Sequence, residues 1–129
     1  MIYGVGTDVV EVSRIAKALE RFGDGFAKKI LSPEEFLVFQ KNNLKENFLA
    51  KRFAAKEAFA KALGTGFRDD LNFKDIEIMN DNFGKPYYLM TKKITQIIRK
   101  KFKVKNFDCF LSISDEKEYS TAFTIIQST

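Results

Sequence analysis

The side chains available for chemistry exclude one large group of enzymes. The 129-residue chain contains no histidine, so serine–histidine catalysis, cysteine–histidine catalysis and metal binding by histidine are all excluded. Acid, base or metal chemistry must use carboxylates, lysines, water or backbone groups instead. The residues best suited to such chemistry are Asp8, the pair Glu57 and Lys61, and the loop Gly64-Thr65-Gly66.

Glu57 and Lys61 lie four residues apart in a segment that is predicted to be a long helix. Phe53, Glu57 and Lys61 follow the spacing i, i+4, i+8 and share one row of that helix, and Phe53 favours an inward-facing row. A carboxylate on a half-buried face needs a partner. An ordinary surface pair worth roughly 0.2–0.5 kcal/mol explains the spacing equally well, so both interpretations stay open.

The glycine-flanked loop after this helix could hold an anion. Gly64-Thr65-Gly66 leaves the backbone open to a ligand, and Lys61 stands one turn earlier. Gly64 is also an expected helix end, and glycines that follow a helix do not make a Walker loop. Asp8, at the end of a predicted strand, suits either a helix cap or a hard cation such as Mg²⁺.

The pattern of the chain predicts the elements that must position these residues. The first half should contain a strand over 1–12 and helices over 13–22, 33–40 and 45–63. The second half should contain strands over 73–79 and 87–90, a helix over 92–102, and strands over 107–114 and 119–126. We expect a single domain over residues 1–129 with an α+β fold, in which a mainly antiparallel sheet packs against a long central helix and shorter helices.

Two of the predicted helices have informative details. Ser32 is the expected N-cap of the second helix, and Glu35 should complete a capping box with it. In the first helix, Ile15, Leu19 and Phe22 share one face and should be its buried side.

Composition and net charge limit the class of binding partner and the cellular compartment that we expect. The net charge of +5 and the pI of about 9.3 favour an anionic partner without naming one. A single cysteine suits a reducing compartment, and no apolar stretch approaches the roughly 20 residues that span a bilayer. We therefore expect a cytoplasmic protein that does not bind membranes.

Five segments, in order, resemble the holo-acyl-carrier-protein synthase family of 4′-phosphopantetheinyl transferases. They are 4–15 (GVGTDVVEVSRI), 30–35 (ILSPEE), 48–66 (FLAKRFAAKEAFAKALGTG), 84–86 (GKP) and 111–116 (LSISDE) followed by Tyr119. The resemblance covers nearly the whole chain, and the segment 48–66 is the most specific. It implies the fold of that family, a trimer with active sites between subunits, and an enzyme that needs magnesium.

The resemblance also implies roles for individual residues. Asp8 and Glu57 would bind Mg²⁺, and together with Lys61 they would be the catalytic residues. Coenzyme A is the substrate. It would be held by residues of the segments 48–66 and 84–86, namely Arg52, Lys61, Gly64, Thr65, Gly66, Lys85 and Pro86. Asp115 stands where one branch of the family has a histidine, so the role of that position is open.

The implied reaction loads a carrier protein for fatty acid biosynthesis. A serine hydroxyl of apo-acyl carrier protein attacks the β-phosphate of coenzyme A, which gives the holo-carrier and 3′,5′-ADP. We favour Glu57 as the base, directly or through water, and Lys61 as the group that stabilises the leaving phosphate.

A basic helix face is the expected docking site for the acidic, helical carrier protein. It consists of Arg14, Lys17 and Arg21, with help from Lys28. A merely solvated helix face is the alternative.

Three other functions stay open. Seven basic residues between 92 and 105 could bind nucleic acid, although no recognition motif accompanies them. The chain could also be a structural domain, or it could hydrolyse coenzyme A instead of loading a protein.

Overall fold

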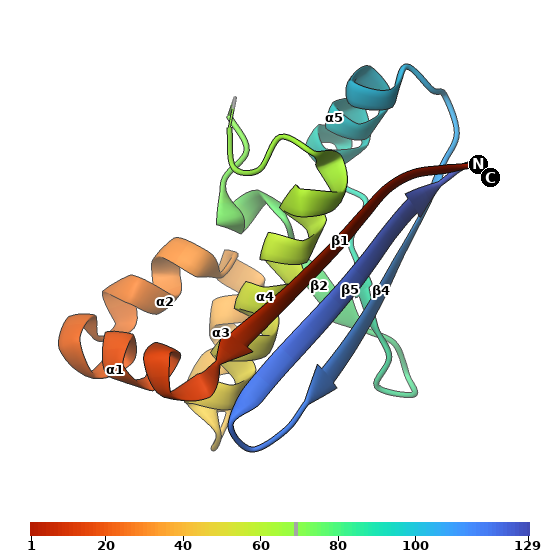
Figure 1. Cartoon of the computed structure of the whole chain (residues 1–129). Helices are drawn as coiled ribbons and strands as arrows, with labels where there is room; N and C mark the ends of the chain where they lie inside the picture. The colour runs from red at the N-terminus through yellow and green to blue at the C-terminus, as the bar shows by residue number, and fades with distance from the viewer. Residues whose placement is uncertain (69) are drawn as a thin grey trace.

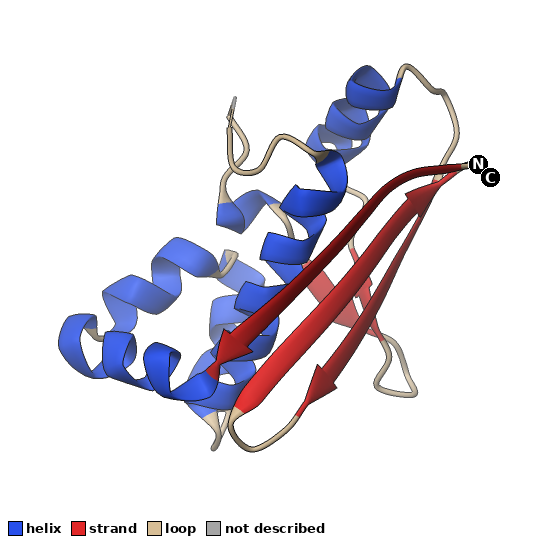
Figure 2. Ribbon diagram, viewed as in Figure 1, coloured by secondary structure: helices blue, strands red, loops and turns tan. Residues whose placement is uncertain are grey.

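The computed structural model describes residues 1–68 and 70–129. The elements, in order, are β1 (Ile2–Glu11), α1 (Val12–Phe22), α2 (Asp24–Ile30), α3 (Pro33–Lys41), α4 (Lys45–Leu63), the 3₁₀ helix η1 (Phe73–Asp75), β2 (Ile78–Asn80), β3 (Pro86–Tyr88), α5 (Lys92–Phe102), β4 (Asp108–Asp115) and β5 (Tyr119–Gln127). The α+β fold class is confirmed. In Figures 1 and 2, α4 lies across one face of a three-stranded sheet, α1–α3 gather at one end of α4, and α5 lies near the other end.

The sheet is antiparallel and has the order β1-β5-β4. Side chains alternate between the two faces of a strand, so Gly4, Gly6, Asp8 and Val10 point toward α4. Their partners on β5 share that face, and these are the buried residues Ser120, Ala122, Thr124 and Ile126. The alternation therefore turns Asp8 toward the long helix. A second sheet is the short hairpin of β2 and β3.

Two glycines allow β1 to lie directly against the backbone of α4. A Cβ atom on Gly4 would lie 1.9 Å from the carbonyl oxygen of Ala62, and one on Gly6 would lie 1.8 Å from that of Ala58. Both distances are far inside van der Waals contact, so only glycine fits. The glycines of the first motif thus set the spacing between the strand that carries Asp8 and the helix that carries Glu57.

We expect Gly6→Ala to destabilise the protein by about 3 kcal/mol or more, because the new methyl group meets helix backbone that cannot move aside by itself. The melting temperature should fall by roughly 10 °C. Gly25→Ala is the matched control, since a Cβ there meets nothing within 4 Å and alanine favours the helix by up to about 1 kcal/mol. Equal melting temperatures for the two variants would contradict this explanation.

The long helix begins and ends where the sequence predicts. It covers Lys45–Leu63, and Gly64 ends it with a left-handed φ of 84°. The helix contains buried residues in consecutive runs, including Phe48, Leu49 and Phe59, so it is covered on more than one side. Its predicted central position is confirmed. The capping box of Ser32 and Glu35 at the start of α3 is also confirmed.

Three local predictions are wrong. The helix α2 was not predicted, because its seven residues are too few for a clear periodic pattern. The strand expected over 73–79 is instead η1 followed by β2, since Asn72 and Asp75 form a capping box that starts a helical turn. Phe22 is 61% exposed rather than buried: α1 ends there, and the guanidinium of Arg21 lies 5.1 Å from the centre of its ring. None of the described helices is long and apolar enough to cross a membrane.

Candidate functional site

The structure brings Asp8 and Lys61 into direct contact, although they are 53 residues apart. The Lys61 ammonium donates to Asp8 Oδ1 over 3.1 Å. Side chains on a helix lean toward its N-terminus, so Lys61 reaches back along α4 to the strand. The Asp8 side chain is only 15% exposed, whereas that of Lys61 is 54% exposed. The pair therefore lies at the edge of the sheet–helix contact, open to solvent on the lysine side.

Glu57 lies one turn before Lys61 on α4 and belongs to the same group. Its pKa is raised from the ordinary value of 4.5, first by burial and then by the charge of Asp8, while Lys61 opposes the shift. Part of this rise in pKa is electrostatic repulsion by the Asp8 carboxylate. A bound cation would relieve that repulsion.

The donor set suits a hard divalent ion. The described residues contain no group of three or more His, Cys, Asp or Glu side chains that could hold a metal, so a metal held entirely by protein side chains is not expected here. Mg²⁺ commonly binds through one or two carboxylates, together with water and substrate phosphates. Asp8 and Glu57, with an exposed lysine beside them, fit that pattern.

The loop that follows α4 lies next to Lys61. Lys61 and the segment 64–68 line a cavity of about 460 Å³. The N–H groups of Gly64 and Gly66 donate to the carbonyls of Lys61 and Ala60, so they close the helix end and are not directed at a ligand. In this arrangement, anion binding depends on the Lys61 ammonium, the Thr65 side chain and the open space that the glycines leave.

Other predicted nucleotide-binding residues lie in a second, separate cavity. Arg52 and Pro86, which were predicted to bind coenzyme A, line this space of about 330 Å³ together with Asn80 and Asp115, which were not. Arg52 and Lys61 are nine residues apart, which is about 13 Å along a helix axis. Within one chain, the sequence-predicted site is thus divided between the middle of α4 and its C-terminal end.

Arg52 is held firmly at this second cavity. Its side chain is 9% exposed, its Nε lies 3.4 Å from Glu35 Oε2, and its Nη2 donates to Asn80 Oδ1 over 3.0 Å. Burial lowers the pKa of Arg52, and Glu35 opposes that shift. Lys85 is exposed on the hairpin and contacts Asp81 through its backbone N–H, whereas Asp115 lies 3.9 Å from the Lys51 ammonium.

Comparisons with known proteins decide the family. Residues 4–124 match the sequence profile of the 4′-phosphopantetheinyl transferase superfamily. The chain is 52% identical over 126 residues to a holo-(acyl-carrier-protein) synthase of Pelagibacter ubique (strain HTCC1062), and the match covers 98% of this chain and 97% of that protein. The chain belongs to the holo-(acyl-carrier-protein) synthases of this superfamily.

Solved structures of other synthases agree with this assignment. The enzyme from Neisseria meningitidis is 42% identical, with a TM-score of 0.90 and coverage of 99% of this chain and 100% of that chain. The Bacillus anthracis synthase in complex with CoA (3′,5′-ADP) is 35% identical, with a TM-score of 0.81 and coverage of 100% and 99%. The predicted family, fold and enzyme class are therefore confirmed.

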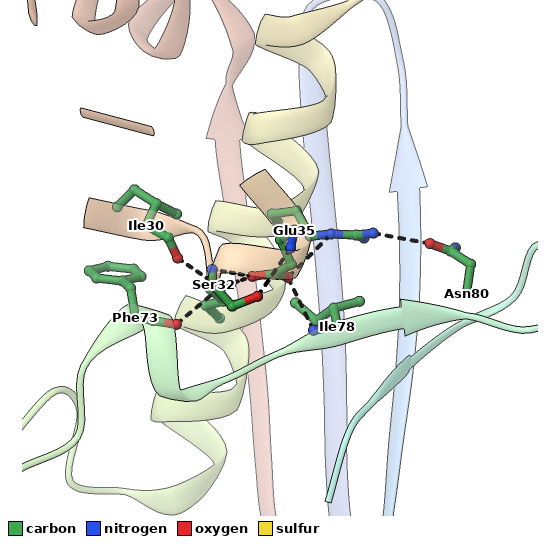
Figure 3. Close-up of polar contacts among 8 residues, drawn as sticks. Ile30, Ser32, Glu35, Phe73, Ile78 and Asn80 are labelled. Atoms are coloured by element: carbon green, nitrogen blue, oxygen red, sulfur yellow. Dashed lines mark hydrogen bonds and ion pairs between the residues drawn. The ribbon is translucent and has the colours of Figure 1, made fainter. Parts of the chain in front are cut away.

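The sequence did not reveal the buried ion pair formed by the residue that precedes Glu57. The preceding residue, Lys56, is completely buried and donates to Glu35 and to the carbonyls of Ile30 and Phe73. Figure 3 shows Ile30, Phe73 and Ile78 arranged around Glu35. Ile78 donates to Glu35, whereas the carbonyls of Ile30 and Phe73 accept from Lys56. The available signal was a lysine among alanines on a helix predicted to be central.

The residues of the predicted docking face are exposed. Arg14, Lys17 and Arg21 lie exposed on α1, and Lys28 is exposed on α2. The Lys28 ammonium lies 5.2 Å from the ring centre of Phe36. These basic groups lie outside both cavities.

Proposed function

We propose that this synthase transfers the 4′-phosphopantetheine group from coenzyme A to a serine of an acidic acyl carrier protein, with Mg²⁺ bound by Asp8 and Glu57. The observation that carries the proposal is the ion pair of Asp8 with Lys61, one helical turn from Glu57 and next to an open loop. Residues 1–129 would be one transferase domain, and the reaction would take place in the cytoplasm.

Each of these side chains has a task in the transfer. The serine oxygen forms a bond to the β-phosphorus of coenzyme A, the bond from that phosphorus to the bridging oxygen breaks, and 3′,5′-ADP leaves with the electron pair. Lys61 would stabilise the charge on the leaving phosphate, and ionised Glu57 would accept the serine proton directly or through water. Mg²⁺ would supply charge neutralisation of the pyrophosphate.

Intact mass of the carrier tests the proposal. The synthase is incubated with coenzyme A, MgCl₂ and apo-acyl carrier protein, and the carrier should gain one phosphopantetheine group. A carrier with its serine replaced by alanine should gain nothing. If coenzyme A is broken down while the carrier keeps its mass, the protein is a hydrolase. If neither changes and RNA binds tightly, the basic segment is a nucleic-acid site instead.

A trimer with sites between subunits would join the two cavities. The face of the sheet away from α4 is apolar and exposed: Val5 is 49%, Val9 63%, Phe110 48% and Phe123 41% exposed, and Figure 1 shows no described helix over that face. Burying these side chains against further copies would stabilise an assembly. The Arg52 cavity of one subunit would then meet the Asp8 and Glu57 group of its neighbour and hold the nucleotide of coenzyme A.

We expect reversal of charge on α1 to weaken carrier binding specifically. The double variant Arg14→Glu and Arg21→Glu should raise the KM for the carrier by about tenfold, because complementary charge speeds encounter with an acidic partner. The KM for coenzyme A should not change, since neither residue lines a cavity. The effect should shrink as salt is added.

The matched control for this experiment reverses two lysines elsewhere. Lys41→Glu with Lys74→Glu makes the same change in net charge on exposed positions of α3 and η1. Steady-state kinetics with varied carrier concentration should then give the wild-type KM. If both double variants raise the KM equally, α1 is not a specific docking face.

A further inference from the structure

The cavity that Arg52 lines is the proposed site for the nucleotide of coenzyme A, and its charges decide how strongly it attracts a phosphate. Three charged residues, Lys51, Arg52 and Asp115, are among those that line its volume of about 330 Å³. The other lining residues are polar or apolar, and they include Phe48 and Asn80. The wall of a site for a phosphorylated ligand therefore contains a carboxylate, which repels a phosphate.

Arg52 keeps part of its positive charge available to the cavity. Its Nε lies 3.4 Å from Glu35 Oε2, and its Nη2 donates to Asn80 Oδ1 over 3.0 Å, so these contacts fix the guanidinium. Glu35 also pairs with the Lys56 ammonium, so two cations share one carboxylate. The three buried side chains of Glu35, Arg52 and Lys56 together carry one net positive charge.

Lys51, by contrast, faces a carboxylate of its own. Its ammonium lies 3.9 Å from Asp115 Oδ2, and the two side chains are 36% and 48% exposed. An ion pair with that exposure contributes little to stability, so the fold does not depend on Asp115. The main effect of Asp115 is to cancel the charge that Lys51 would otherwise present to the cavity.

A phosphate of coenzyme A meets this charge balance directly, provided that the proposed function holds. The pyrophosphate would lie beside Lys61, so the phosphate that enters the Arg52 cavity with the nucleotide is the one on the ribose 3′-oxygen. A phosphate monoester carries a charge of about −1.5 to −2 at pH 7, and Lys51 and Arg52 are the cations that line this cavity. Asp115 repels that phosphate and competes with it for Lys51.

We propose that Asp115 determines donor specificity: it weakens recognition of the 3′-phosphate and so limits the preference of the synthase for coenzyme A over 3′-dephospho-coenzyme A. The chemistry is the same for both donors. The serine oxygen bonds to the β-phosphorus and the bond to the bridging oxygen breaks, so 3′,5′-ADP leaves from coenzyme A and 5′-AMP leaves from the dephospho donor. The two donors differ only in the group that meets Lys51.

Removing the charge of Asp115 tests this inference. Asp115→Asn should raise kcat/KM for coenzyme A by about tenfold, because a carboxylate a few Å from a phosphate is lost. The value for 3′-dephospho-coenzyme A should stay within about twofold of the wild type, as measured from the intact mass of the carrier with each donor. Glu118→Gln, an exposed change in the turn after β4 that does not line the cavity, is the matched control and should preserve the ratio of the two values.

Two further measurements identify Lys51 as the group that is set free. The double variant Lys51→Met with Asp115→Asn should lose the gain with coenzyme A, because the ammonium that the phosphate would meet is no longer there. Calorimetric titration with 3′,5′-ADP and 5′-AMP measures binding without turnover. Asp115→Asn should tighten the binding of 3′,5′-ADP by about tenfold and leave that of 5′-AMP unchanged.

Three outcomes would overturn the inference. Asp115→Asn could leave the ratio of the two donors unchanged, or it could lower kcat/KM for coenzyme A, in which case Asp115 orients Lys51 toward the phosphate. The control Glu118→Gln could shift the ratio equally, which would indicate a general effect of net charge. A wild-type synthase that transfers nothing from either donor contradicts the proposed function itself, so the two failures are distinguishable.

Discussion

Glu57→Gln should reduce the rate of phosphopantetheine transfer by roughly 10²–10⁴-fold, because the amide can neither bind Mg²⁺ strongly nor accept the serine proton. The change keeps the size of the side chain and removes only its charge. The metal-free variant should be at least as stable as the wild type, since the carboxylate it replaces is partly buried and repelled by Asp8. Loss of activity in a well-folded variant would therefore come from the site.

Two measurements separate the contribution of Glu57 to the chemical step from its contribution to Mg²⁺ binding. The single-turnover rate at saturating carrier reports the chemical step, and the rise in melting temperature with added MgCl₂ reports metal binding to the folded protein. Glu57→Gln should have a much lower single-turnover rate and should show no rise in melting temperature with MgCl₂. Glu46→Gln, which removes a carboxylate from the first turn of the same helix, should keep both. Near-normal turnover of Glu57→Gln would exclude this residue from the reaction.

The raised pKa of Glu57 gives magnesium binding a predictable pH dependence. A carboxyl whose pKa is higher in the folded state favours folding when it is protonated, and that contribution is lost as the pH rises through the folded pKa. Mg²⁺ needs the ionised form, so its stabilising effect should grow over the same interval. As the pH is lowered, we expect the rise in melting temperature with MgCl₂ to become smaller before the pH reaches 4.5, the ordinary pKa of glutamate. A constant rise down to that pH would contradict the prediction.

The sequence predicted the long helix that carries Glu57 and Lys61 better than the short segments around it. Helix α4 could be delimited because Gly64 ends it and its 19 residues contain neither glycine nor proline. Helix α2 and the turn η1 have seven and three residues, and in such short segments local capping outweighs periodicity. Asp8 was expected at the end of the first strand, but β1 continues to Glu11. Its contact with Lys61 depends on the register of β1 against α4, which Gly4 and Gly6 set through steric fit.

The roles of charged residues were the hardest to predict. Arg52 was expected to contact phosphate, and the structure adds an ion pair with Glu35 that fixes it in place. Lys100 and Lys101 were grouped with a surface patch, whereas the fold places them at a cavity that residues of the loop after α4 also line. A lysine in a sequence carries no mark of burial or exposure, because both depend on which distant segments pack around it.

Lys56 is the clearest example, and its replacement should have the largest effect on stability. An ammonium has three donors, and Lys56 uses them on Glu35 Oε1 and on the carbonyls of Ile30 and Phe73. Glu35 in turn accepts the N–H groups of Ser32 and Ile78. Burial lowers the pKa of Lys56, but the charge of Glu35 opposes this, and only the charged form can satisfy three acceptors.

Lys56→Met should therefore lower the free energy of unfolding by about 3–5 kcal/mol, because it leaves the buried Glu35 carboxylate short of a partner. That is a large part of the roughly 5–15 kcal/mol that stabilises a typical domain. Lys41→Met, an exposed change on α3, should stay within about 0.5 kcal/mol of the wild type. Denaturant unfolding of both variants measures the difference.

The double variant Glu35→Gln with Lys56→Met tests the cause. If the loss comes from an uncompensated buried charge, the neutral glutamine removes that charge, and the double variant should be more stable than the sum of the single effects predicts by about 1–3 kcal/mol. Strict additivity would mean that Lys56 contributes through packing alone. Coupling would show that Lys56 and Glu35, which also contacts Arg52, act as one buried ion pair.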